Sequence, residues 1–518
     1  MSPRMPGPAD SDVAGDEGGG AEARAHVRGS SLLLVGRVLA TGLNFVTQVL
    51  IVRHLSKTAF GGFAYGLSLA TFGETLVTLG LDRAVTRFVP IHDERREDAK
   101  AAGVIVLVVG AVLALSAAFV VTVLAMQGTV TGSFPAGEVR ATVLILVLLA
   151  PVQALDNLLV GLFAVFTQPR AIFFRRYVVA PLLRLAVVGL VLVDDAGARS
   201  LALGYLAAGA LGVAAYSAVL VRALQRSGHL ERFRRQRVEL PVRAVLGFTV
   251  PLLSTDVVQL LIGSFPILLL GYYAQPGDVA DIRAVQPIAN LNQIVLLSFG
   301  VLFTPVASRL LARGRESAIG RLYWQSGATV AVLTFPLLLV SFSLAHSVSV
   351  TLFGAQYERS GDLLAILAAG QFVSAALGFN SLTLAVLGRV RQVVRINVVT
   401  AVANLALSFA LIPAHGALGA AIAMGATLVL VNVLRQLDLR STGIPAFDAT
   451  YAPVYAAMVI GAISVLLLDV VVEPHLAVGL LACLPVAAAV LLIARPSIRL
   501  GDTFPELARL PVVGRVLR

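Results

Sequence analysis

Long apolar runs recur along this chain from residue 30 almost to the C-terminus, each about as long as a membrane crossing. Hydrophobic residues make up 58% of the sequence and charged residues only 13%, which is not the balance of a soluble globular protein. A helix needs about 20 predominantly apolar residues to cross the hydrocarbon core, and about fourteen stretches meet this requirement. The sequence therefore predicts an all-α integral membrane protein. The predicted spans are 30–53, 58–81, 101–126, 140–166, 171–193, 200–224, 244–272, 283–308, 318–344, 362–388, 390–412, 416–437, 450–470 and 475–494.

Arginine occupies every second gap between these runs. The basic gaps are 83–100, 170–176, 226–243, 309–321, 389–395 and 435–440. The alternate gaps, 127–139, 194–199, 273–282, 345–361, 413–415 and 471–474, contain almost no Lys or Arg. Because short cytoplasmic loops carry an excess of positive residues, the alternation predicts an even number of spans and two cytoplasmic termini. We expect a multi-pass protein of the cytoplasmic (plasma) membrane.

The net charge of +11 and the pI near 10.3 do not indicate a nucleic-acid partner. The positive residues lie at cytoplasmic helix ends, where they orient the chain and meet anionic lipid headgroups. Cys483 is the sole cysteine, so no intramolecular disulfide or thiolate cluster can form. The seven histidines show no metal-ligand spacing, and we expect neither a metal nor a cofactor.

The loops are too short to contain a folded catalytic domain, because none exceeds about twenty residues. We therefore do not expect an enzyme. The glycine-rich segment 61–66 superficially resembles a phosphate-binding loop, but it opens a membrane span and follows no strand. Close helix packing explains its small residues better.

Two pairs of segments repeat across the chain, and the members of each pair lie six spans apart. ALDNLLVGLFAVF from residue 154 corresponds to ALGFNSLTLAVLG from residue 376, and LGLDRAVTRFVP corresponds to LFTPVASRLLAR. An even offset gives both copies the same orientation, which predicts two six-helix lobes related by an axis along the membrane normal. The predicted division is a disordered cytoplasmic tail (1–29, without a cleavable signal peptide), an N-lobe (30–226), a basic inter-lobe loop (227–243), a C-lobe (244–440), two further spans (441–495) and a basic cytoplasmic tail (496–518).

Several motifs resemble one known family. NVVTAVANLALSFALIPAHGALGAA at 397–421 is similar to the N-x6-N…LIP-x-x-G-x-x-GAA pattern of the polysaccharide transporter (Wzx-type) branch of the multidrug/oligosaccharidyl-lipid/polysaccharide (MOP) exporter superfamily. LFGAQY at 352–357 and TLGLDRAVTRFVP at 78–90 resemble further segments of that branch. The resemblance covers roughly residues 30–495. It implies a flippase that moves a polyprenyl-linked oligosaccharide to the outer leaflet, with polysaccharide-assembly proteins as further partners.

Polar residues inside the spans mark candidate substrate contacts, because charges at mid-membrane depth usually face a partner or a wet cavity. Arg37, Asn44 and Gln48 share one face of the first span. Arg37 and Glu74 lie at similar depth and could pair, as could Asp156 and Arg184. The predicted substrate-binding residues are Arg37, Asn44, Gln48, Glu74, Asp156, Arg184, Gln259, Asn380 and Asn404.

Each of these residues also has a structural interpretation. The two charge pairs also fit a purely interhelical role, and amides often hydrogen-bond across membrane helices as packing contacts. Asp256 has no charged neighbour in its own lobe, so coupling to Na⁺ or a proton and helix packing both remain open for it.

Three functions remain on sequence grounds. A lipid-linked oligosaccharide flippase would use cleft arginines to bind pyrophosphate or acidic sugars. A cation-coupled multidrug (MATE-like) exporter would have a more acidic and aromatic cleft. A polytopic glycosyltransferase or polymerase is a remote alternative, because the chain lacks large loops and a constellation of catalytic carboxylates.

Overall fold

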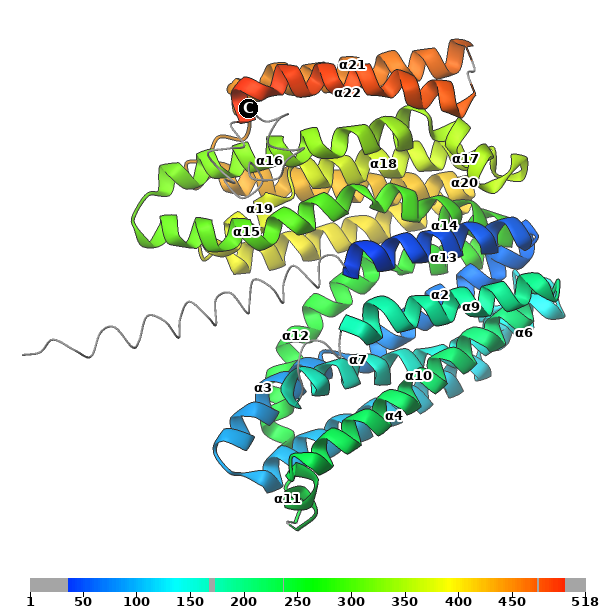
Figure 1. Ribbon diagram of the computed structural model, residues 1–518, viewed down its shortest axis with the longest axis vertical. Helices are drawn as coiled ribbons and strands as arrows, with labels where there is room; N and C mark the ends of the chain where they lie inside the picture. The colour runs from blue at the N-terminus through cyan, green and yellow to red at the C-terminus, as the bar shows by residue number, and fades with distance from the viewer. Residues whose placement is uncertain (1–35, 167–172, 236, 473–474, 499–518) are drawn as a thin grey trace, which may run out of the picture.

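The computed structural model describes residues 36–166, 173–235, 237–472 and 475–498, and this part of the chain is helical throughout, without strands. Figure 1 shows two groups of long helices that lie side by side, with α21 and α22 along the outer side of one group. The prediction of an all-α membrane protein is therefore confirmed.

The first group follows a helix at 36–54 and contains the elements up to residue 235. These are α2 (Lys57–Thr78), α3 (Leu81–Glu94), α4 (Asp98–Ala125), α5 (Gln127–Val130), α6 (Glu138–Val147), α7 (Leu149–Phe166), the π-helix η1 (Phe174–Val179), α9 (Ala180–Val193), α10 (Ala198–Arg226) and α11 (His229–Arg235). Helix α2 packs on α6 and α7, and α10 packs on α6, α7 and α9.

The second group begins with a bent helix pair. Its elements are α12 (Val242–Gly263), α13 (Phe265–Tyr273), α14 (Pro276–Asn290), α15 (Asn292–Ala312), α16 (Glu316–Leu338), η2 (Leu339–Ser343), α17 (Ala345–Phe353), η3 (Ala355–Tyr357), α18 (Ser360–Ala376), α19 (Phe379–Val386) and α20 (Val390–Arg440), followed by η4 (Ala449–Tyr451), α21 (Ala452–Val472) and α22 (Leu476–Ile498). Helix α18 lies at the centre and packs on α14, α16 and α20.

Ten helices in the described residues are long and apolar enough to span a membrane, and the pair α12–α13, bent by 41°, makes an eleventh. Helix α20 counts once in this number although it contains two of the predicted spans. The helix at 36–54 and α2 lie at the first two predicted spans. Every described residue range that the sequence predicted as a span thus falls mainly on helix.

Helix α20 is a hairpin rather than one continuous rod. Its 51 residues would extend about 77 Å if straight, far beyond the ~30 Å hydrocarbon core. The chain instead reverses at Gly416, where φ is 53° and ψ is −127°. Asn404 Nδ2 consequently donates to Thr427 Oγ1 at 2.9 Å, a contact that a straight helix could not make.

The two groups meet tightly where α2 packs against α14 (Figure 1). A Cβ on Gly61 would lie 1.9 Å from the carbonyl oxygen of Pro276, so only glycine permits this approach. Lys57 Nζ pairs with Asp281 at 2.7 Å, and the Arg53 guanidinium donates to the carbonyls of Thr351 and Leu352. The glycine-rich segment therefore serves helix contact, as predicted.

At the opposite end of the molecule, which has the arginine-rich loops, the groups diverge in Figure 1. Their link there is α12, which packs on α3 of the first group and on α20 of the second. The backbone N–H of Glu239 also donates to Ala99 O at 3.2 Å. We call this the arginine-rich end, and the end at which α2 meets α14 the joined end.

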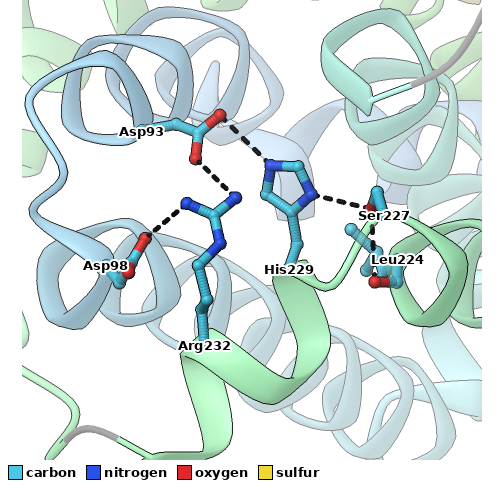
Figure 2. Close-up of polar contacts among 6 residues, drawn as sticks. All are labelled: Asp93, Asp98, Leu224, Ser227, His229 and Arg232. Carbon is cyan, nitrogen blue, oxygen red and sulfur yellow. Dashed lines mark hydrogen bonds and ion pairs between the residues drawn. The ribbon is translucent and has the colours of Figure 1, made fainter.

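The short helix α11 is fastened to the corner between α3 and α4 (Figure 2). Arg232 lies 3.3 Å from an oxygen of Asp98 and 3.5 Å from one of Asp93, while His229 Nε2 lies 3.3 Å from the other Asp93 oxygen. In the same corner a hydrogen bond with His92 lowers the pKa of Glu97. Ion pairs at the protein surface therefore hold α11, the last helix of the first group, against the corner between α3 and α4.

Replacing Gly416 with Ala should destabilise the protein, because a side chain strains this backbone conformation and Asp278 Oδ1 lies 3.2 Å from the new Cβ position. We expect a loss of about 1–3 kcal/mol, measured as a lower melting temperature in detergent. Gly110→Ala is the matched control, since its Cβ meets no atom within 4 Å. Equal melting temperatures for the two variants would show that a side chain at position 416 causes no strain in the hairpin.

The arginine alternation predicts that the two ends face different compartments. In a Cys483→Ser background, Gln356→Cys near the joined end should react with an impermeant maleimide in intact cells. Glu231→Cys at the arginine-rich end should react only after the cells are opened. Labelling in the reverse order would invert the predicted orientation.

Candidate functional site

A cavity of about 810 Å³ lies between the two groups. Its walls come from the helix at 36–54 with α2, α7, α9 and α10 on one side, and from α14 and α15 on the other. Three arginines line it, and no Asp or Glu is among its described lining residues. The polar lining residues used below are Arg37, Asn44, Gln48, Gln153, Arg184, Arg283, Gln286, Asn290 and Gln293.

Arg283 of α14 joins the two groups inside this cavity. Its Nη2 donates to Ser68 Oγ of α2 at 2.6 Å and its Nη1 donates to Gln286 Oε1 at 2.8 Å. The Gln48 amide donates to the Arg283 carbonyl at 3.1 Å. These side-chain partners are neutral, and no ion pair involves Arg283 in the described part of the chain. Its charge is therefore available to an anion.

Arg37 and Arg184 line the same cavity from the first group. Arg37 precedes Gln48 by about 16 Å along its helix, which places it nearer the arginine-rich end. The predicted Arg37–Glu74 pair is wrong for this conformation, because the Glu74 carboxylate accepts a hydrogen bond from Asn157 of α7. Glu74 faces a neighbouring helix and not the cavity, so equal depth did not bring the two side chains together.

The predicted Asp156–Arg184 pair is also wrong for this conformation, because Asp156 pairs with Arg175 at 2.7 Å. Sequence analysis assigned Arg175 to a cytoplasmic turn, yet it is 6% exposed and lies over the ring of Tyr216. Gly212 leaves room for it, since a Cβ there would lie 2.5 Å from Arg175 Nη2. Arg175 therefore balances the charge of Asp156 inside the first group. Arg184, which lines the cavity, is left to interact with a bound anion.

The candidate residues on the other helices lie elsewhere. Asn380 donates to Asn432 and Asn404 donates to Thr427, and both are fully buried in the second group, away from the cavity lining. The side chain of Gln259 lies outside the described part of the structure. Asn44 and Gln48 do line the cavity.

Asp256 has a charged partner that sequence reasoning did not identify. Arg83 Nη2 of α3 lies 2.7 Å from Asp256 Oδ1 of α12, so the ion pair links the two groups. The Asp256 side chain is 14% exposed, and Arg83 was counted among the cytoplasmic arginines. A cation or proton at Asp256 would have to replace this partner.

Sequence analysis missed Arg283 as a site residue. One signal was present, because Arg283 begins a span at the end where the arginine alternation predicts almost no basic residues. An arginine that departs from the positive-inside pattern is more informative than one that follows it.

The arrangement of the helices is found in solved membrane proteins that share little sequence with this chain. It is similar to a solved structure titled lipid II flippase MurJ in an inward closed conformation, with a TM-score of 0.67, 12% identity and coverage of 92% of this chain and 100% of the other. It is also similar to a MATE family multidrug resistance transporter in an inward-facing conformation, with a TM-score of 0.61, 14% identity and coverage of 78% and 95%.

The family described as Polysaccharide biosynthesis protein matches residues 26–311, and this chain belongs to it. A relative, an uncharacterized membrane protein of Methanocaldococcus jannaschii, is 23% identical over 422 residues, which is 76% of this chain and 80% of the relative.

Arg83→Gln and Asp256→Asn should each loosen the link between α3 and α12. If the pair acts as a unit, the double variant should be no less stable than the worse single variant, with a coupling energy of about 0.5–1 kcal/mol in a double-mutant cycle. Ion coupling gives a different result, in which only Asp256→Asn loses the response of transport to an imposed Na⁺ or pH gradient. If the stability losses of the two single variants add up in the double variant, the two side chains do not interact and the ion pair is contradicted.

Proposed function

We propose that this transporter flips a polyprenyl-linked oligosaccharide from the cytoplasmic to the outer leaflet of the cytoplasmic membrane. The observation that carries the proposal is the cavity between the two groups, lined by Arg37, Arg184 and Arg283 and by no described carboxylate. The family membership and the similarity to a structure titled lipid II flippase support it.

The charge balance of the cavity favours an anionic substrate. An unpaired cation inside a membrane protein costs at least about 2.5–3.5 kcal/mol on insertion scales, and a bound anion offsets this cost. Guanidinium groups bind phosphate oxygens through two parallel hydrogen bonds, which a diphosphate can accept from more than one arginine. The apolar lipid tail remains in the bilayer between helices, while the headgroup occupies the cavity.

The contacts between the groups suit alternating access. We propose that the groups correspond to the lobes 30–226 and 244–440 and that they rock about the cavity, with both termini cytoplasmic. Lys57–Asp281 and the Gly61–Pro276 approach close the joined end, which is the outer end in this orientation. Opening that end requires these contacts to separate, and coupling to Na⁺ or protons at Asp256 would require Arg83 to move.

A multidrug exporter fits the cavity less well. Phe45, Phe60, Phe63 and Tyr205 line part of it and offer apolar surface to a drug. An organic cation, however, would meet three arginines there and no described acidic side chain. The cavity therefore favours the flippase over the cation-coupled exporter.

Arg283→Gln keeps a hydrogen-bonding side chain but removes the charge, so it should weaken binding of a polyprenyl diphosphate at least about tenfold, the scale of a lost charge-assisted hydrogen bond. Arg37→Gln should act in the same direction. Lysine at either position should restore binding only in part, because it lacks the planar fork. Binding is measured with purified protein in nanodiscs.

Arg313→Gln is the control, because this arginine lies at the arginine-rich end between α15 and α16 and does not line the cavity. If the Arg283 and Arg37 variants bind polyprenyl diphosphate as tightly as the parent protein, the arginines do not form the anion site and the proposal fails.

A further inference from the structure

Three amide side chains form a connected hydrogen-bonded chain at the second-group wall of the cavity. Gln293 Nε2 of α15 donates to Gln371 Oε1 of α18 at 2.9 Å, and Gln371 Nε2 donates to Asn290 Oδ1 of α14 at 2.7 Å. Asn290 and Gln293 line the cavity, whereas Gln371 is not among the described lining residues. We call these three residues the amide chain.

The amide chain runs in one direction, and this decides which groups remain for a ligand. Gln293 donates to Gln371, and Gln371 donates to Asn290. These two hydrogen bonds occupy the amide nitrogen of Gln293 and the amide oxygen of Asn290. The Gln293 oxygen stays available as an acceptor and the Asn290 nitrogen as a donor, since no hydrogen bond in the described residues occupies either. A hydroxyl group both donates and accepts, and two neighbouring hydroxyls match the two ends.

Both lining amides lie where α14 passes into α15. Helix α14 ends at Asn290 and α15 begins at Asn292, and Leu291 between them keeps helical backbone angles (φ −56°, ψ −31°). Asn292 is fully buried and donates to the Ala289 carbonyl, so it does not face the ligand.

The amide chain begins close to the anion site. Arg283, Gln286 and Asn290 are spaced by three and four residues and share one face of α14. Arg283 and Asn290 are about 10 Å apart along the helix. This separation suits a diphosphate at Arg283 with its first sugar at Asn290 and Gln293.

We infer that Asn290 and Gln293 bind hydroxyl groups of a neutral sugar attached directly to the diphosphate, and that Gln371 positions them. The inference rests on the proposed function. A carboxylate in place of one of these hydroxyls has no hydrogen to donate to the Gln293 oxygen and would be repelled by it, so a uronic acid that turns its carboxylate toward the amides fits this position poorly. Gln371 acts through its neighbours and needs no contact with the substrate.

The test uses full-length protein in nanodiscs and three lipids: a polyprenyl diphosphate without sugar, one with a neutral hexose, and one with a hexuronic acid. The parent protein should bind the hexose lipid about tenfold more tightly than the sugar-free lipid, the effect of one or two hydrogen bonds. The uronic acid should bring a smaller gain, because a carboxylate near the Gln293 oxygen is repelled by it. Affinities are measured by microscale thermophoresis.

Gln293→Met, Asn290→Leu and Gln371→Met should remove the hexose preference while leaving affinity for the sugar-free lipid unchanged. Gln371→Asn, which keeps the amide but is one methylene too short to reach both partners, should do the same. Gln153→Met is the matched control, because Gln153 lines the cavity from α7 and belongs to no part of the amide chain. It should retain the preference.

The outcomes separate the two proposals. Equal binding of all three lipids by the parent protein would overturn the amide site and leave the flippase proposal intact. Failure of the parent protein to bind any of the lipids would overturn the flippase proposal itself. A full hexose preference in both Gln371 variants would end the positioning role of Gln371.

Discussion

The scarcity of water inside the bilayer governs the arrangement of charge in this protein. A charged side chain there must meet an opposite charge or a wet cavity. Both solutions occur in this protein. Asp156 and Arg175 neutralise each other inside the first group, while Arg283 is held by neutral partners at the boundary between the groups. The first arrangement contributes to the fold, and the second leaves a positive charge where a substrate can reach it.

The two ends of the molecule are joined by different means. At the joined end, α2 and α14 are in direct contact, with Lys57–Asp281 beside them. At the arginine-rich end, the groups are linked by α12, whose Asp256 pairs with Arg83 of the first group and which also packs on α20 of the second. The span formed by α12 and α13, bent by 41°, contacts both groups. This asymmetry fits the alternating access proposed above.

The fold was largely predictable from sequence, whereas the site was predictable only in part. Hydropathy located the helices because each crossing must satisfy its own backbone hydrogen bonds, and even the reversal at Gly416 coincides with the predicted start of a span. Arg37, Asn44, Gln48 and Arg184 line one cavity, and their roles in substrate binding stay predictions. The ion-pair partners were predicted wrongly because helical periodicity gives the face and depth of a residue but does not show which neighbouring helix that face contacts. Asp156 therefore pairs with Arg175 instead of Arg184, and Arg283 was overlooked as a span terminus.

The approach of Gly61 to the Pro276 carbonyl has an energetic consequence for the proposed rocking of the two groups. Where two helices are sealed by interlocked side chains, parting them exposes apolar area and leaves gaps that other side chains must fill. At Gly61 the contact surface is mainly backbone, so separation of the helices uncovers little hydrocarbon and lets water reach the Pro276 carbonyl oxygen. The neighbouring polar contacts, Lys57–Asp281 among them, then contribute most to holding this end closed, and water can replace them too.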